Sequence, residues 1–285
     1  ASVLQVFLSL AKRDAIFYLT ILVALANSSA VYQFLCSYSG SSLSEFFMIT
    51  GELNSFLVMD DLSRHAMAYR EIYLLLRRPP GREAYPGEIF FVHSRLLERS
   101  AKLSYNLGGG SLTCFPIIET LSGDVSAYIT TNVISITDGQ IFLSTDLFLN
   151  GIKPALDVGL SVTRVGSIAQ WYGMKLVAGS FKLQLAQFTE LQAFSQFASD
   201  LGEDTKNRLA AGRILVETLK QSNGSPINLT IQVGILSLAN QAVLRKIQVY
   251  QVSSFLASII LVPVWAKLYV STKHLANSII SYLSK

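Results

Sequence analysis

Two adjacent carboxylates, Asp60 and Asp61, follow the short apolar run FLVM. A parallel strand places the residues that follow it at the carboxyl edge of its sheet, where ligands of open α/β sheets bind. A carboxylate at that edge is able to hold water ligands of a nucleotide-bound Mg²⁺, which keeps several waters and takes few protein oxygens. The same pattern also suits an acid pair that only caps the strand. Taken alone, these residues leave both interpretations open.

A single arginine, Arg164, lies in the segment SVTRVGS. A guanidinium is planar, permanently charged and rich in directed donors, so it suits the charge that develops on a transferring phosphoryl group. For a lone arginine, a structural role as a helix cap or as the partner of a carboxylate would be preferred. The residue type predicts phosphate chemistry only if its sequence context supports it.

The tract RRPPGREAYPG at residues 77–87 also has two interpretations. Three arginines beside proline turns are compatible with an anion-binding loop. A rigid connector is the alternative, because proline fixes φ and removes a backbone donor. We favour the connector.

Several kinds of site are not indicated by the sequence. The phosphate-binding pattern GxxxxGK[ST] is absent from all 285 residues. His65, His93 and His274 are dispersed and none begins a His-Glu-x-x-His pattern, so we expect core or solvated histidines rather than a metal site. Cys36 and Cys114 lack CxxC or His spacing, which predicts buried thiols. No Ser-His-Asp pattern or nucleophile elbow is present.

Composition limits the possible partners. Hydrophobic residues make up 51% of the chain and charged residues 15%, so we expect much of its surface to be covered by other chains. The net charge of +4 is small, and its Lys and Arg residues are scattered rather than gathered into a stripe. Nucleic-acid binding is therefore not expected.

The elements that would position these residues follow from hydrophobic periodicity. Apolar runs predict strands at Ala15–Ala26, Ser55–Met59, Ser111–Ile118, Asn132–Ile136 and Gln140–Leu143, and the last two are joined by the turn Thr137-Asp138-Gly139. Helical spacing predicts helices at Ser44–Ile49, Leu62–Leu76, Glu88–Lys102, Lys182–Phe197, Asp204–Gln221, Ile231–Gln241 and Val243–Leu256. The fold class is therefore α/β over residues 1–170, with a parallel sheet, followed by a helical bundle over residues 171–285.

Two apolar segments resemble membrane spans in composition. Ala15–Ala26 is too short to cross a hydrocarbon core of about 30 Å, and a buried parallel strand has the same composition. Val252–Val270 is longer but is interrupted by Pro263 and Lys267. We expect a buried strand and a helix of the terminal bundle, in which the residues from Gln241 onward take part.

The order of these segments resembles the α subunit of F-type ATP synthase. The apolar run with its acid pair, the RRPPGREAYPG tract and GLSVTRVGSIAQ occur in the family's order, and the resemblance extends from about Ser2 to about Gln221. It implies part of a RecA-like nucleotide-binding domain, a C-terminal helical bundle, and ATP or ADP with Mg²⁺ as ligands. The family's P-loop lies upstream of the matched region, so the chain resembles the second part of an α subunit.

The resemblance also implies roles for particular residues. In related α subunits the arginine at the position of Arg164 enters the active site of the neighbouring β subunit. Asp60 matches the Mg-associated carboxylate, and Glu119 in PIIETLSGD is expected nearby.

Four further residues match positions near the bound adenine. Lys153 and Pro154 lie in GIKPA, where the family has an arginine before the proline. Gln221 and Asn223 lie in LKQSNGSP, where the family has Gln-x-Gln. A point charge replaces a stacked guanidinium at Lys153, so base contacts are expected to be weakened or rearranged.

Three functions are compared on this basis. The first is a non-catalytic α-type subunit of rotary ATP synthase that holds nucleotide and donates Arg164. The second is a self-contained P-loop-type ATPase, either β-like or of secretion systems, and the third is a membrane protein. The segment NVISITDGQIFLSTDLF at residues 132–148 matches α and not β subunits, which favours the first.

The first function implies several partners. They are β subunits, a separate N-terminal α fragment carrying the P-loop, and central-stalk and peripheral-stalk subunits, with membrane contact only through the complex. The chain alone is not expected to be active. A naturally divided subunit is favoured over an artificial fragment, and the expected location is the matrix-facing sector of the mitochondrial inner membrane, with a bacterial or plastid membrane as the alternative.

Overall fold

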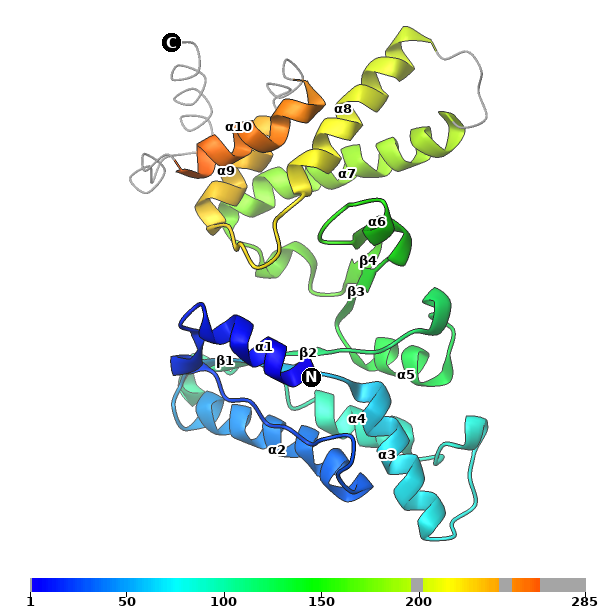
Figure 1. The fold of residues 1–285 in the computed structure, drawn as a ribbon. Coiled ribbons are helices and arrows are strands. Elements are labelled where there is room, and N and C mark those ends of the chain that lie inside the picture. The colour runs from blue at the N-terminus through cyan, green and yellow to red at the C-terminus, as the bar shows by residue number, and fades with distance from the viewer. Residues whose placement is uncertain (1, 196–201, 241–247, 262–285) are drawn as a thin grey trace. The chain divides into compact units, whose positions relative to one another are not determined.

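The computed structural model describes residues 2–195, 202–240 and 248–261. The chain divides into two compact units, unit 1 at Ala1–Thr137 and unit 2 at Asp138–Lys285 (Figure 1). Each unit has its own hydrophobic core. The predicted domain boundary at residue 170 stays a prediction.

Unit 1 combines a short parallel sheet with helices. Its elements in chain order are α1 (Ser2–Ala11), η1 (Ala15–Tyr18), α2 (Ala30–Ile49), β1 (Asn54–Met59), α3 (Leu62–Leu75), η2 (Arg82–Ala84), α4 (Ile89–Leu97), η3 (Tyr105–Leu107), β2 (Ser111–Pro116), η4 (Leu121–Gly123) and α5 (Tyr128–Ile136). The two strands pair in parallel, from Asn54 opposite Ser111 to Met59 opposite Pro116. Parallel neighbours need a long crossover, which α3 and α4 provide.

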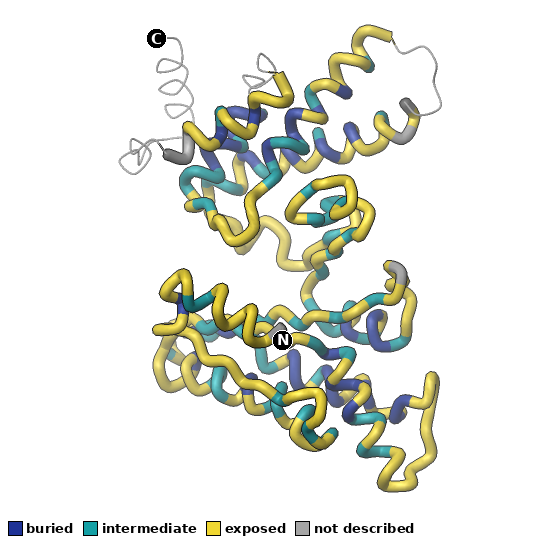
Figure 2. The backbone as a smooth tube through the Cα atoms, in the orientation of Figure 1, coloured by how far each residue is buried: buried dark blue, intermediate teal, exposed yellow. Residues whose placement is uncertain are grey.

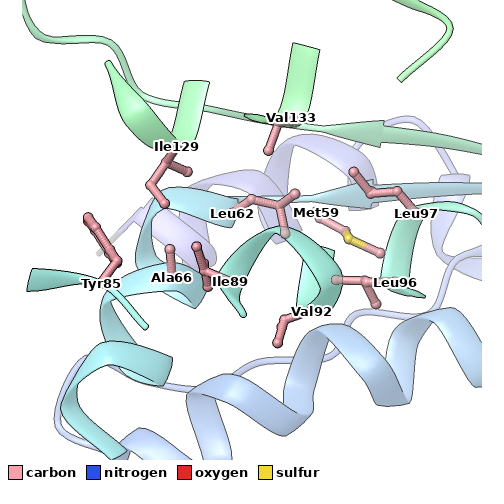
Figure 3. Packing of buried hydrophobic residues seen from close by; sticks show 10 residues of the cluster. All are labelled: Met59, Leu62, Ala66, Tyr85, Ile89, Val92, Leu96, Leu97, Ile129 and Val133. Carbon is pink, nitrogen blue, oxygen red and sulfur yellow. The ribbon is translucent and has the colours of Figure 1, made fainter. Parts of the chain in front are cut away.

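The core of unit 1 forms where α3, α4 and α5 meet the sheet (Figure 3). Leu62 and Ala66 are four residues apart on α3 and are fully buried, as is Ile89 on α4. Side chains alternate along β1, so Leu57 and Met59 pack toward this core, whereas Phe56 and Val58 are exposed. One face of the sheet is therefore covered and the other carries exposed apolar residues. Figure 2 shows buried residues of unit 1 on the helices α3, α4 and α5.

Unit 2 begins with a hairpin and continues as helices. Its elements are β3 (Gly139–Leu143), α6 (Thr145–Leu149), β4 (Leu156–Thr163), η5 (Gly166–Ala169), α7 (Tyr172–Ser195), α8 (Glu203–Leu219), α9 (Leu229–Asn240) and α10 (Val249–Leu261). β3 and β4 pair antiparallel, with an irregularity between Gln140 and Phe142. Leu238 on α9 and Val252 on α10 are fully buried in a core that α7 and α8 complete.

Helices α7 and α8 approach each other closely at Gly212 of α8. A Cβ atom at this position would lie 2.0 Å from Cδ2 and 2.2 Å from Cγ of Phe188 on α7, far inside van der Waals contact. Only glycine leaves room for the Phe188 ring at this distance.

Most predicted elements are confirmed. Strands form within Ser55–Met59, Ser111–Ile118 and Gln140–Leu143, and helices within Leu62–Leu76 and Glu88–Lys102. The predicted helix at Ser44–Ile49 is the end of the longer α2. After Trp171 the described residues contain helices and no strand, as predicted.

Two strand predictions are wrong. Asn132–Ile136 belongs to α5, because Ile129 and Val133 are buried four residues apart and this helical packing overrides the β-branched composition. Thr137-Asp138-Gly139 therefore joins a helix to β3 rather than joining two strands.

The other wrong prediction is the strand at Ala15–Ala26. Ala15–Tyr18 is a 3₁₀ helix, and Leu19–Leu25 forms no ladder with a described strand. Its side chains are mostly exposed, so the covering layers that define a buried parallel strand are missing in the described residues.

In the described residues, no helix combines the length and apolar character that a membrane span requires. Helix α10 covers the first part of the predicted apolar run Val252–Val270. The rest of that run, including Pro263 and Lys267, and most of the predicted terminal segment from Gln241 onward lie outside the described residues.

Candidate functional site

The carboxyl edge of the β1–β2 sheet carries the two predicted acids of unit 1. Asp60 directly follows β1, and Glu119 comes three residues after β2 ends, so both lie at the same edge of the parallel pair. Both are exposed. The backbone holds this edge together, because the Leu62 N–H donates to the Ile117 carbonyl (2.9 Å) and the Ile117 N–H donates to the Met59 carbonyl (2.9 Å).

The neighbouring acid has a different role. The Asp61 side chain accepts a hydrogen bond from the Arg64 N–H (2.6 Å) and caps α3. The Ser63 hydroxyl, in the first turn of α3, accepts from the Glu119 N–H (3.0 Å) and ties that segment to the helix. Only Asp60 of the pair is therefore left for a cation, and it would supply one oxygen donor group among waters. In the described parts of the chain, no cluster of three or more His, Cys, Asp or Glu residues could hold a metal by itself.

The predicted adenine residues of unit 2 converge on one pocket. Lys153, Pro154, Gln221 and Asn223 all line a cavity of about 840 Å³. The pocket is held together by the backbone, since the Gln221 N–H after α8 donates to the Lys153 carbonyl (2.8 Å). Segments about seventy residues apart in sequence are thus joined at this point (Figure 1).

Helix α6 supplies the aromatic wall of this pocket. Ser144 caps α6 by accepting from the Leu147 N–H (3.4 Å), and this short helix presents Phe148. Phe148 is 53% exposed, and the Lys153 Nζ lies 4.8 Å from its ring centroid. Pro154 and Pro226 add apolar surface, and the side chains of Ser222 and Asn223 add polar groups. The cavity has the size of a small-molecule site and combines a flat apolar surface with a few hydrogen-bonding groups.

Phe148 was missed by sequence reasoning. The available signal was an aromatic residue five positions before Lys153, in TDLFLNGIKPA, but spacing alone does not show that the intervening turn folds the ring back over the lysine.

Arg164 lies at the open end of the hairpin, immediately after β4. Its backbone N–H donates to the carbonyl of Asp138, the residue before β3 (2.6 Å). The residue is exposed and is not part of the pocket lining. The structure thus separates Arg164 from the four pocket residues.

The RRPPGREAYPG tract links α3 to α4. The guanidinium carbon of Arg78 lies 5.6 Å from the ring centroid of Tyr73, and that of Arg82 lies 5.3 Å from the ring of Tyr128. The Gly81 N–H donates to the Tyr85 carbonyl (2.8 Å) and closes the loop. Two of its three arginines therefore contact aromatic rings instead of converging on an anion, which agrees with the connector interpretation.

Comparison with known protein families decides between the general interpretations. Residues 1–163 match the nucleotide-binding domain of the ATP synthase alpha/beta family, and residues 170–267 match the C-terminal domain of the alpha/beta chain. The chain belongs to the ATP synthase alpha/beta family. It is a subunit of a rotary ATP synthase or of a related ATPase, with a nucleotide-binding domain followed by a C-terminal helical domain.

Proposed function

We propose that this ATP synthase alpha/beta family chain is the second part of an α-type subunit of rotary ATP synthase. In this role it holds nucleotide at a non-catalytic site and donates Arg164 to the catalytic site of an adjacent β subunit. The observation that carries the proposal is the convergence of Lys153, Pro154, Gln221 and Asn223 on one pocket. These residues come from two segments that are distant in sequence, and an unrelated fold would not be expected to place them around one cavity.

The pocket is proposed to hold the adenine ring. Phe148 offers a half-exposed aromatic face, and stacking on such a face is tolerant of small changes in the surrounding groups. The Lys153 ammonium over the same ring supplies a point charge in place of a planar guanidinium. Asn223 offers a donor and an acceptor to the edge of the base.

Mg²⁺ is proposed to be held through water by Asp60, with Glu119 at the same sheet edge. The exposed Asp60 carboxylate fits this role, since Mg²⁺ retains most of its waters when it binds beside phosphates. When bound, the ion neutralises phosphate charge. The β- and γ-phosphates need a P-loop, which these 285 residues lack, so we propose that an N-terminal α fragment supplies it.

Arg164 is proposed to act outside its own chain. It follows a strand end, is exposed, and is fixed through its backbone by Asp138. A guanidinium placed in this way in a β-subunit site would stabilise the charge developing on the transferring phosphoryl group. The further partners of the assembly are central-stalk and peripheral-stalk subunits, and the proposed location is the matrix side of the mitochondrial inner membrane.

The pocket assignment is tested by photolabelling with an azidoadenine nucleotide. The full chain is combined with β subunits and a P-loop-bearing chain, and labelled peptides are identified by mass spectrometry. Label is expected at residues 143–154 or 221–226. Phe148→Ala should weaken nucleotide binding about 5- to 100-fold, the worth of one base–aromatic stack.

Phe194→Ala is the matched control, because Phe194 is also exposed in unit 2 but does not line the pocket. It should leave binding unchanged. Label confined to other peptides, or equal effects of the two substitutions, would overturn the pocket assignment. The chain alone is expected to bind ATP weakly, and tight Mg-dependent binding without the other chains would contradict the need for an added P-loop.

A further inference from the structure

Two histidines far apart in sequence contact each other in the core of unit 1. His65 on α3 and His93 on α4 are 2% and 0% exposed, and the His65 Nδ1 lies 3.3 Å from the His93 Nε2. At this distance the two rings form a hydrogen bond, in which the N–H of one ring donates to the unprotonated nitrogen of the other.

Aromatic side chains from α2 enclose this pair. The Phe34 ring is stacked on His65 at 4.8 Å between centroids, with 18° between the planes, and the Tyr38 ring lies 5.9 Å from His65. The Tyr38 hydroxyl donates to the Val92 carbonyl of α4 (2.9 Å). The histidine pair therefore lies where three helices meet.

Only one hydrogen fits between the two contacting nitrogens, His65 Nδ1 and His93 Nε2. In the neutral pair, one ring donates and the other accepts. The outward nitrogens, His65 Nε2 and His93 Nδ1, are buried and have no hydrogen-bond partner among the described residues. A first added proton must go to one of these buried nitrogens, and a second leaves two N–H groups facing each other at the shared contact.

The surrounding charged groups do not compensate a positive charge on the pair. Glu88, before α4, accepts from the Tyr69 hydroxyl of α3 and forms no hydrogen bond with either ring in the described residues. Arg95 of α4 faces Tyr38. The Arg99–Glu45 ion pair is internally neutral and joins α2 to the end of α4.

The titration of both rings agrees with this geometry. Burial, and to a smaller extent the neighbouring His93, together lower the pKa of His65 to about 3, and the Phe34 backbone has a smaller opposite effect. Burial lowers the pKa of His93 to about 4. Since both lie below the unfolded value of about 6.5, the pair stabilises the fold fully above pH 6.5 and progressively less as the pH falls toward 4.

We propose that His65 and His93 form an acid-sensitive lock, which joins α2, α3 and α4 only while both imidazoles are neutral. Mild acidification shifts unit 1 toward an open state in which these helices separate and the rings become protonated. The lock depends on residues of unit 1 alone, so it holds whether or not the proposed function is correct.

Hydrogen exchange measured by mass spectrometry on the full chain tests this lock. Exchange of α3 and α4 peptides is compared at pH 7.5 and pH 5.0 after correction for intrinsic rates. Two histidines with these pKa values predict that the opening constant of unit 1 rises about 10²- to 10³-fold over this range. Peptides of α7–α9 report unit 2 and should respond less.

The double substitution His65→Gln and His93→Gln removes the titration but keeps hydrogen-bonding groups. It should reduce the pH response of α3 and α4 to less than about tenfold. His274→Gln, which changes the remaining histidine of the sequence, should leave the full response. Equal pH responses in the parent chain and the double variant would overturn the lock.

A second measurement needs no substitution. Selective ¹³C labelling of the histidine Cε1 atoms allows each ring to be titrated by NMR. The resonances of the folded state from His65 and His93 should stay at their neutral positions down to pH 5. Titration of both near pH 6.5, with α3 and α4 still protected from exchange, would equally overturn the proposal.

Discussion

The two units differ in how complete their candidate sites are. In unit 2, a pocket is closed by the chain's own backbone through the Gln221–Lys153 hydrogen bond, and its aromatic wall is in place. In unit 1, Asp60 and Glu119 lie exposed at the edge of a two-stranded sheet whose outer face is also exposed. A site made by contacts within one unit is preassembled, whereas a site at an open sheet edge needs atoms from elsewhere.

The largest expected effect separates the roles of the two units. In a reconstituted complex, Arg164→Ala should lower turnover about 10³- to 10⁵-fold, about 4–7 kcal/mol, because arginine fingers act on the transition state. Arg164→Lys should also be severely impaired, since an ammonium lacks the guanidinium fork. Asp60→Asn in unit 1 should have a smaller effect, because the site proposed for Asp60 is non-catalytic.

Steady-state hydrolysis and synthesis check this prediction, with assembly and nucleotide occupancy as controls. Both controls should stay near normal in Arg164→Ala. Near-normal turnover would make Arg164 a structural residue, and a larger loss from Asp60→Asn than from Arg164→Ala would reverse the proposed division of roles.

The next effect tests whether the two cores are energetically separate. Leu62 in unit 1 and Leu238 in unit 2 are both fully buried, so each change to alanine should destabilise its own unit by about 2–5 kcal/mol. Hydrogen exchange should rise in α3 and α4 for Leu62→Ala and in α7–α9 for Leu238→Ala. If either substitution raises exchange equally in both units, they unfold as one cooperative body.

Sequence periodicity predicted the elements whose side-chain spacing was unambiguous. Helix α3 carries buried residues four apart and follows a capping Asp61, and both signals are local. The α5 segment failed because its β-branched composition favours a strand, whereas burial of Ile129 and Val133 favours a helix. That burial includes contacts between α5 and α4, and a local sequence window does not contain such long-range contacts.

Sequence resemblance pointed to four residues that line the pocket but not to the aromatic residue beside them. Lys153, Pro154, Gln221 and Asn223 were found from two short motifs, and the structure places them around one cavity. Phe148 was missed because its role depends on the fold of the turn between α6 and Lys153. The His65–His93 contact was missed for a similar reason, since the two residues belong to different helices and neither has a metal-site spacing.

A smaller effect tests the packing that keeps unit 2 compact. Gly212→Ala should destabilise this unit by about 1–3 kcal/mol, because the new Cβ would meet the inner atoms of the Phe188 side chain. Gly179→Ala on α7 is the matched control, since a Cβ there meets nothing within 4 Å. It should stabilise the helix by up to about 1 kcal/mol.

Urea unfolding followed by the fluorescence of the chain's two tryptophans, Trp171 and Trp265, measures both glycine variants. Exchange of α7 and α8 peptides should change in the same direction. Opposite signs for the two substitutions are the expected result. If Gly212→Ala leaves the free energy of unfolding unchanged, α7 and α8 adjust their spacing at little cost. The packing of unit 2 would then tolerate changes as easily as the open sheet of unit 1.

The smallest effect concerns the exposed face of the β1–β2 sheet. Phe56 is 61% exposed, and its ring meets that of Phe115 edge-on, with centroids 5.0 Å apart. Phe56→Ser loses this cross-strand pair but opens no cavity, so the chain alone should lose about 1 kcal/mol or less, as measured by exchange in α3 and α4. A double-mutant cycle with Phe115→Ser should attribute most of that loss to the aromatic pair. A loss of about 3 kcal/mol or more would show that this face is covered in the chain alone, and the contrast between a closed unit 2 and an open unit 1 would fail.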